Sequence, residues 1–123
     1  MNVIVIPGKP IPLARPRRAK NGGMYDSQKC EKMAVQMIMK RYNPEFLLSD
    51  SPLFVEMVFY FNTPKRKGES HTGRPDVDNL VKFYLDCLNG ILIKDDKYVS
   101  SLYCRKEFCD VEETIIRICS LAT

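Results

Sequence analysis

The chain has 123 residues, of which 45% are hydrophobic and 28% charged, and its formal net charge at pH 7 is +4. This length supports one domain, spanning residues 1–123, with one hydrophobic core. Its apolar runs are far too short to cross a bilayer, so we expect no membrane association. The opening residues lack a basic segment followed by a long apolar run, so we expect no secretory signal and a cytoplasmic location.

The charge is distributed unevenly along the chain. Residues 1–50 contain nine Lys/Arg and four Asp/Glu, a net +5, whereas residues 51–123 contain ten and eleven, a net −1. A basic half beside a locally acidic half is typical of a polyanion-binding surface next to a metal site. A mildly basic soluble protein would have the same net charge.

The five cysteines are an odd number, spread over predicted helices and strands. The spacing of Cys104 and Cys109 resembles half of a zinc site, but no second cysteine pair completes it and His71 is the only histidine. We therefore expect reduced cysteines that serve as small apolar residues.

The first half of the chain predicts a strand, a basic loop and a helix. Residues 1–6 form a short apolar strand that ends at Pro7-Gly8, and residues 8–23, rich in Pro, Gly, Arg and Lys, form a loop. Ser27 can cap a helix that runs to Tyr42 and ends before Asn43-Pro44. Its expected core stripe consists of Cys30, Met33, Ala34, Met37 and Ile38.

Residues 53–61 predict the next strand. The side chains that share one of its faces are Val55, Met57, Phe59 and Phe61. Because the other face is also apolar apart from Glu56, we expect this strand to be central in its sheet. A polar loop over residues 63–74 follows.

The rest of the chain predicts a helix and two strands. The helix spans residues 76–89 and stops at Gly90; its predicted buried face is Val77, Leu80, Val81, Tyr84, Leu85 and Leu88. After a short apolar segment and a turn, strands over residues 98–108 and 111–119 complete an α+β domain, a mixed or largely antiparallel β-sheet packed with two main helices.

Four carboxylates stand out around this second helix. Asp76 and Asp78 flank Val77 at the helix start, and Asp95-Asp96 follow the helix. If Val77 points into the core, both earlier carboxylates can point away from it. Lys82 shares a helix face with Asp78, one turn later.

Each of these residues also has an ordinary explanation. Aspartates at helix starts serve as caps, a pair such as Asp78 and Lys82 is a common surface ion pair worth about 0.3–0.5 kcal/mol, and Asp95-Asp96 suits a solvated turn. The combination favours a metal site, because four carboxylates that converge would repel one another without a cation. Their all-oxygen chemistry suits Mg²⁺ or Mn²⁺ rather than zinc.

These residues carry a family resemblance. Residues 74–82 read Arg-Pro-Asp-Val-Asp-Asn-Leu-Val-Lys, residues 85–90 read Leu-Asp-Cys-Leu-Asn-Gly, and residues 94–96 read Lys-Asp-Asp. This order resembles the central motif of RusA-type crossover junction endodeoxyribonucleases, with Cys87 where alanine is usual. Further similar segments are Gly8-Lys9-Pro10, Arg15-Pro16-Arg17, Tyr25 and Arg105-Lys106-Glu107-Phe108.

The resemblance implies a RusA-like fold and a homodimer that resolves four-way (Holliday) DNA junctions by paired symmetric nicks, in recombination and repair, often in a prophage context. It implies Mg²⁺ or Mn²⁺ and no small-molecule cofactor. Asp76, Asp78 and Asp96 would hold the metal, with Asp95 as the alternative third ligand, and Lys82 would assist catalysis by countering charge on the phosphate. One metal and two metals both remain open.

Nine basic residues are candidates for contacts with the DNA backbone: Lys9, Arg15, Arg17, Arg18 and Lys20 in the first loop, Lys65, Arg66 and Lys67 in the second, and Arg74. A non-catalytic nucleic-acid-binding module would explain these loops but not the carboxylates. A metal-dependent phosphatase would use the carboxylates but needs a closed pocket.

Overall fold

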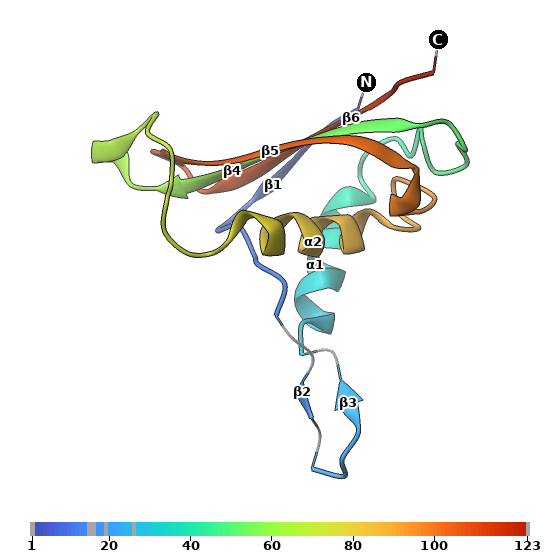
Figure 1. Ribbon diagram of the computed structural model, residues 1–123, viewed down its shortest axis with the longest axis horizontal. Helices are drawn as coiled ribbons and strands as arrows, with labels where there is room; N and C mark the ends of the chain where they lie inside the picture. The colour runs from blue at the N-terminus through green and yellow to red at the C-terminus, as the bar shows by residue number, and fades with distance from the viewer. Residues whose placement is uncertain (1, 15–16, 19, 26, 123) are drawn as a thin grey trace.

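The computed structural model describes residues 2–14, 17–18, 20–25 and 27–122, without the side chains of residues 17, 18, 24 and 25. A four-stranded mixed sheet forms one layer, and two helices lie on one of its faces (Figure 1). The predicted α+β domain with a mixed sheet and two main helices is confirmed. The sheet, in the order β1-β6-β4-β5, consists of β1 (Asn2–Pro7), β6 (Glu113–Ser120), β4 (Leu53–Asn62) and β5 (Val99–Cys109).

Strand β4 is central, as its two apolar faces predict. It pairs with β6 antiparallel and with β5 parallel. Val55, Met57 and Phe59 are fully buried against the helices, and Val58, on the opposite face, is also buried. The sequence pattern therefore located the middle of the sheet.

Helix α2 (Val77–Leu88) lies in the crossover that joins the parallel strands β4 and β5. Of its predicted buried face, Val77 and Leu85 are only partly buried, whereas Phe83 and Cys87 are fully buried as well. The Tyr84 hydroxyl accepts a hydrogen bond from the Ile11 amide (3.0 Å), which holds the segment after β1 against the helix.

Helix α1 (Lys29–Met39) buries a different face from the one predicted. Cys30, Met33, Ala34 and Met37 are exposed and Ile38 is half-buried, while the buried apolar side chains are Val35 and Met39. The prediction was wrong because apolar residues occur on both sides of this helix, and packing against α2 selected the other side. Polar contacts also hold α1 to α2. Gln36 Nε2, for example, donates a hydrogen bond to the Cys87 carbonyl oxygen (3.3 Å).

The start of α1 also differs from prediction. The residue before the helix is Gln28 rather than Ser27, and its side chain makes no capping bond. Instead, buried Gln28 accepts from the Ala14 amide (2.7 Å) and donates to the Pro12 carbonyl (2.8 Å). The first part of the predicted loop is thereby tied to the base of α1.

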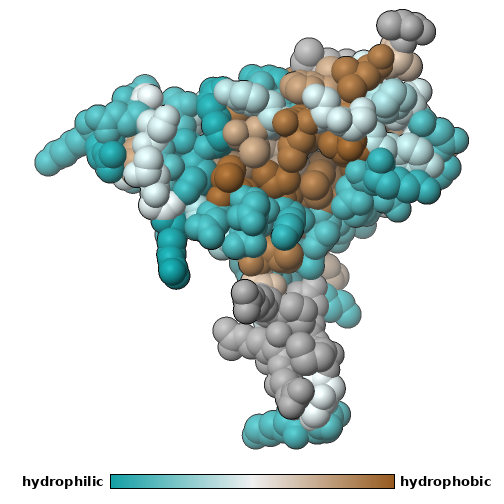
Figure 2. Space-filling model, viewed as in Figure 1, coloured by the Kyte–Doolittle hydropathy of each residue, from teal (hydrophilic) through white to brown (hydrophobic). Residues whose placement is uncertain are grey.

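The predicted loop over residues 8–23 contains the short strand β2 (Arg17–Arg18), which pairs antiparallel with β3 (Met24–Tyr25) directly after the loop. They form a ribbon that projects beyond the N-terminal end of α1 (Figure 1). Figure 2 shows apolar side chains gathered between the sheet and α2 on the face in view. None of the helices in the described ranges is long and apolar enough to span a membrane.

Candidate active site at the start of helix α2

Asp76 and Asp78 stand at the N-terminal end of α2, as predicted. Asp76 is the N-cap residue, with an extended backbone (φ −70°, ψ 142°), and its side chain makes no capping hydrogen bond. Asp78 lies in the first turn, and Val77 between them packs partly into the core. Both carboxylates are exposed. Since neither makes an ion pair with any described residue, both are available to bind a cation.

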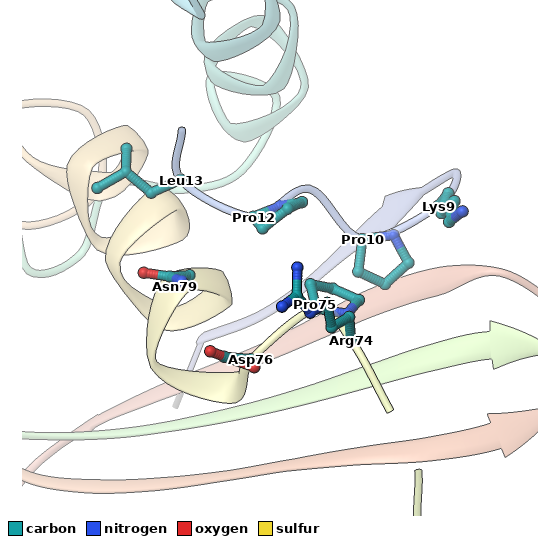
Figure 3. A pocket seen from close by; sticks show the side chains of 8 residues that line it. All are labelled: Lys9, Pro10, Pro12, Leu13, Arg74, Pro75, Asp76 and Asn79. Atoms are coloured by element: carbon teal, nitrogen blue, oxygen red, sulfur yellow. The ribbon is translucent and has the colours of Figure 1, made fainter. Parts of the chain in front are cut away.

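A pocket of about 600 Å³ opens beside Asp76 (Figure 3). Asp76 and Asn79 come from α2, Arg74 and Pro75 from the preceding loop, and the remaining wall from the segment after β1: Lys9, Pro10, Pro12 and Leu13. The Leu13 amide donates to the Asn79 carbonyl (2.9 Å), which fixes this wall against the helix. One carboxylate and two basic side chains around an open pocket suit a phosphate with its counter-cation.

Lys106 on β5 anchors the loop that leads to Asp76. Its half-buried side chain donates to the carbonyl oxygens of Gly73 and of Pro75, the latter at 2.8 Å. Sequence reasoning assigned Lys106 no role in the site. The position of Lys106 on β5 could have indicated such a role. The residue alternates with Cys104 and Phe108 on the core-facing side of the strand, where a lysine requires polar partners.

His71 belongs to the same anchor. Its ring lies between those of Phe61 and Phe108, at centroid distances of 4.6 and 4.5 Å, and Nδ1 accepts from the Gly73 amide (3.1 Å). Burial, and then the charge of Lys106, lower the pKa of His71 below its usual value. The neutral ring therefore packs and accepts a hydrogen bond.

Asp95 and Asp96 lie elsewhere. They form the start of the short 3-10 helix η2 (Asp96–Tyr98), where the Asp95 side chain accepts from the Lys97 amide (2.9 Å). That hydrogen bond is the main reason why the pKa of Asp95 is lowered. Asp96 is half-buried and has no capping role. The side chains of Asp95 and Asp96 also interact with each other, so the two carboxyl groups lie side by side.

The four carboxylates do not converge within one chain. Helix α2 is about 18 Å long, and η2 lies beyond its C-terminal end, whereas Asp76 stands at its N-terminal end (Figure 1). Along β5, Val99 follows η2 and Lys106 reaches the loop before Asp76; these seven steps of strand span about 23 Å. Among the residues described, no group of three or more His, Cys, Asp or Glu side chains could hold a metal ion. Within one chain Asp96 is therefore far from Asp76, because it lies in the connection after α2 and the chain returns toward Asp76 only along β5.

Lys82 is exposed on α2, one turn after Asp78. The two residues do not form an ion pair with each other, so the predicted surface ion pair is not what holds the lysine. Asp86, a further turn along, pairs with Lys32 of α1 instead (3.5 Å). The Lys82 ammonium is consequently accessible on the face that also presents Asp78.

The basic residues predicted to contact DNA lie in three different parts of the structure. Lys9 and Arg74 line the pocket, and Lys20 is exposed in the β2–β3 ribbon. Arg17 and Arg18 form β2, their side chains are outside the described atoms, and Arg15 lies outside the described residues.

The third place is the end of the sheet around the 3-10 helix η1 (Pro64–Arg66). Lys65 is exposed there, Lys67 pairs with Asp110 (3.1 Å), and Arg66 pairs with Glu69 (2.6 Å). Figure 2 shows this end as hydrophilic. Lys67 and Arg66 are thus partly neutralised by their acidic neighbours.

Comparison with known proteins gives two matches. A family model described as Endodeoxyribonuclease RusA matches residues 7–119, nearly the whole chain. The chain is also 29% identical, over 121 residues, to the uncharacterized protein YqaN of Bacillus subtilis (strain 168), with 84% of each protein covered. The family match includes every carboxylate and basic residue discussed above.

Proposed function

Since the chain belongs to the RusA endodeoxyribonuclease family, we propose that it is a Mg²⁺-dependent nuclease that resolves four-way DNA junctions by paired symmetric nicks, in recombination and repair. The observation that carries this proposal is the pair of exposed carboxylates, Asp76 and Asp78, at the end of α2 beside a pocket lined by Lys9 and Arg74. Mn²⁺ is the alternative cation.

The carboxylate pair fits Mg²⁺ by its chemistry. Mg²⁺ in nucleic-acid enzymes is commonly bound through one or two carboxylates together with water and substrate phosphate. Asp76 and Asp78 are exposed and make no ion pair with the described residues, so they offer such a set from one chain. When bound, the ion would polarise the phosphodiester and lower the pKa of a coordinated water.

The basic residues near the pair have complementary roles in the proposed reaction. Lys9 and Arg74 would bind the phosphate at the pocket and orient the scissile bond, since both line the same pocket as Asp76. Lys82 would stabilise the charge that develops on the phosphate oxygens as the 3′ oxygen leaves. Lys20 and Lys65 would contact backbone phosphates farther out, which suits recognition of junction shape rather than sequence.

Asp96 is the proposed third ligand, and its distance from Asp76 supports a homodimer. A carboxylate at the far end of α2 cannot join Asp76 of its own chain without rearranging the domain. It can be supplied by a second copy, and two symmetric sites would then make the paired nicks. Asp95 is the weaker choice because its side chain is engaged with the Lys97 amide.

The proposal is tested with a labelled four-way junction, the matched duplex and the single strand, each with and without Mg²⁺. We expect paired nicks in the junction, dependent on the cation, and far slower cleavage of the other substrates. Binding of the junction without cleavage at any Mg²⁺ or Mn²⁺ concentration would favour a non-catalytic DNA-binding module. Equal cleavage of all three substrates would exclude junction selectivity.

A further inference from the structure

The pocket beside Asp76 is larger than a phosphate and a cation require. Its volume of about 600 Å³ lies within the range of roughly 300–1,000 Å³ that is usual for sites that enclose an organic ligand. The charged side chains that line it, Lys9, Arg74 and Asp76, are all exposed, so they form its rim. The phosphate and the cation of the proposed reaction need only this rim, which leaves the rest of the pocket without a ligand.

Below the rim the lining is apolar apart from one amide. It consists of Pro10, Pro12, Leu13, Pro75 and Asn79. Pro10 is buried and the other four are half-buried. Figure 3 shows the segment after β1 crossing the start of α2, where Asp76 and Asn79 lie. Apolar walls, together with one group that both donates and accepts hydrogen bonds, suit a planar ring with polar atoms along its edge.

We propose that this part of the pocket takes one unstacked nucleobase from the crossover of the junction, next to the phosphodiester held at the rim. The inference rests on the proposed function, because the strand that Asp76 and Asp78 cut would bring the base to the pocket. The ring would pack against the prolines, and the Asn79 amide would pair with the polar edge of the base.

The Asn79 side chain is available for this contact. Its amide makes no hydrogen bond with any residue that the structure describes, whereas its backbone carbonyl accepts from the Leu13 amide (2.9 Å). A half-buried amide is more stable when water or a ligand satisfies it. Asn79 follows Asp76 by three residues, so both lie on the same side of α2. A nucleotide whose phosphate is held near Asp76 can therefore extend its base toward Asn79.

Hydrogen bonds fix both walls of the pocket before any ligand binds. On one side the Gln28 side chain donates to the Pro12 carbonyl (2.8 Å), and on the other Lys106 donates to the Pro75 carbonyl (2.8 Å). The proline rings have little conformational freedom to lose. A preformed site of this kind binds its ligand with a smaller loss of entropy.

A junction supplies an unstacked base more readily than a duplex does. Taking a base out of a helix costs its pairing and stacking energy, and the cost is smallest where the stack is already interrupted. Stacking is interrupted at the crossover of an open junction and is continuous within each arm. The pocket would therefore favour the crossover over duplex DNA, a preference that contacts with backbone phosphates alone do not provide.

The test is the fluorescence of 2-aminopurine, a base analogue that becomes brighter when it is unstacked. The analogue is placed in turn at each base that flanks the crossover of a four-way junction, and the protein is added to saturation without divalent cations. The variant Asn79→Met removes the amide and fills part of the pocket. The matched control, Asn62→Met, makes the same change at the exposed end of β4.

We expect the wild type and the control to raise the fluorescence at least about twofold at one or more of these positions, because the base leaves the stack. The increase with Asn79→Met should be less than half as large. If this variant fails to fold by circular dichroism, Asn79→Leu, with Asn62→Leu as its control, replaces it under the same criteria.

Saturated binding without an increase at any position, or an increase that the Asn79 variant retains by half or more, would overturn this inference. A protein that does not bind the junction would overturn both this inference and the proposed function. An increase that is not followed by cleavage when Mg²⁺ or Mn²⁺ is added would contradict the proposed function alone. Cleavage without any increase would contradict the base pocket alone.

Discussion

Lys106 Nζ donates a hydrogen bond to the carbonyl oxygen of Pro75 over 2.8 Å, and so joins β5 to the residue directly before Asp76. The same ammonium also binds the Gly73 carbonyl. Because the backbone at Asp76 sets where its carboxylate points, this half-buried lysine positions the candidate site.

Lys106→Met should loosen the loop before α2. We expect cleavage to fall at least about tenfold, which corresponds to about 1.4 kcal/mol of transition-state stabilisation. The free energy of unfolding should fall by about 0.5–1.5 kcal/mol, the net contribution of a typical hydrogen bond. Lys106→Arg should recover part of both. Single-turnover cleavage and urea unfolding measure the two effects, with exposed Lys65→Met as the control. If the Met variant cleaves like Lys65→Met, the positioning role is wrong.

Asp78→Asn should abolish cleavage while junction binding survives. The amide keeps the shape of the side chain but removes the charge that would hold the cation, and the basic residues remain. Asp86→Asn, on the same helix, is the control, since Asp86 pairs with Lys32. Cleavage gels and binding isotherms on the same junction separate the two properties. Near-normal cleavage by Asp78→Asn would remove this residue from the site.

Lys82→Ala should fold and bind junctions, yet cleave at least roughly tenfold more slowly at saturating Mg²⁺, as expected for loss of an electrostatic contact made in the transition state. Lys82→Arg should restore only part of the rate, because a planar guanidinium places its charge differently. Since Lys82 forms no ion pair with the described residues, unfolding curves should be unchanged. A wild-type rate for Lys82→Ala would show that the lysine is only a solvated surface residue.

Mixing two inactive variants should restore cleavage. Asp76→Asn lacks a ligand at one end of α2 and Asp96→Asn lacks the ligand at the other. If each site draws Asp96 from the second copy, a mixed dimer contains one site with both substitutions and one intact site. Equal mixing should then give about half of the dimers one active site each and yield single nicks. No recovery after subunit exchange, verified by tagged copies, would contradict a shared site.

The stability of the loop around His71 should depend on pH. Folding lowers the pKa of His71 below its ordinary value of 6.5, mainly through burial, so the folded state favours the neutral ring. Its contribution to stability is present above the unfolded pKa and is lost as the pH falls from 6.5 through the folded pKa, because the unfolded chain binds the proton first.

His71→Phe provides the comparison, since it preserves a ring between Phe61 and Phe108 but does not titrate. Urea unfolding of both proteins at pH 7.5, 6.5 and 5.5 measures the difference in their unfolding free energies. The wild type should lose more stability than the variant as the pH falls. A constant difference would indicate that His71 has the same pKa in both states.

The sequence by itself determined the fold class and the location of one half of the site. Apolar residues on both faces of residues 53–61 predicted a central strand, and β4 pairs with a strand along each of its edges. The position of Asp76 and Asp78 around Val77 likewise determined that both carboxylates start a helix and face outward, since helical periodicity is a local property.

Only the tertiary structure decided which side of α1 packs on the domain and where the later carboxylates lie. Helix α1 has apolar residues on both sides, so its periodicity alone could not choose between Val35 with Met39 and the stripe at Met33 and Met37. The separation of Asp96 from Asp76 depends on the length of α2, because Asp96 lies in the connection after the helix and the chain returns toward Asp76 only along β5. Both features depend on contacts between residues that are distant in sequence, and a local sequence pattern does not predict such contacts.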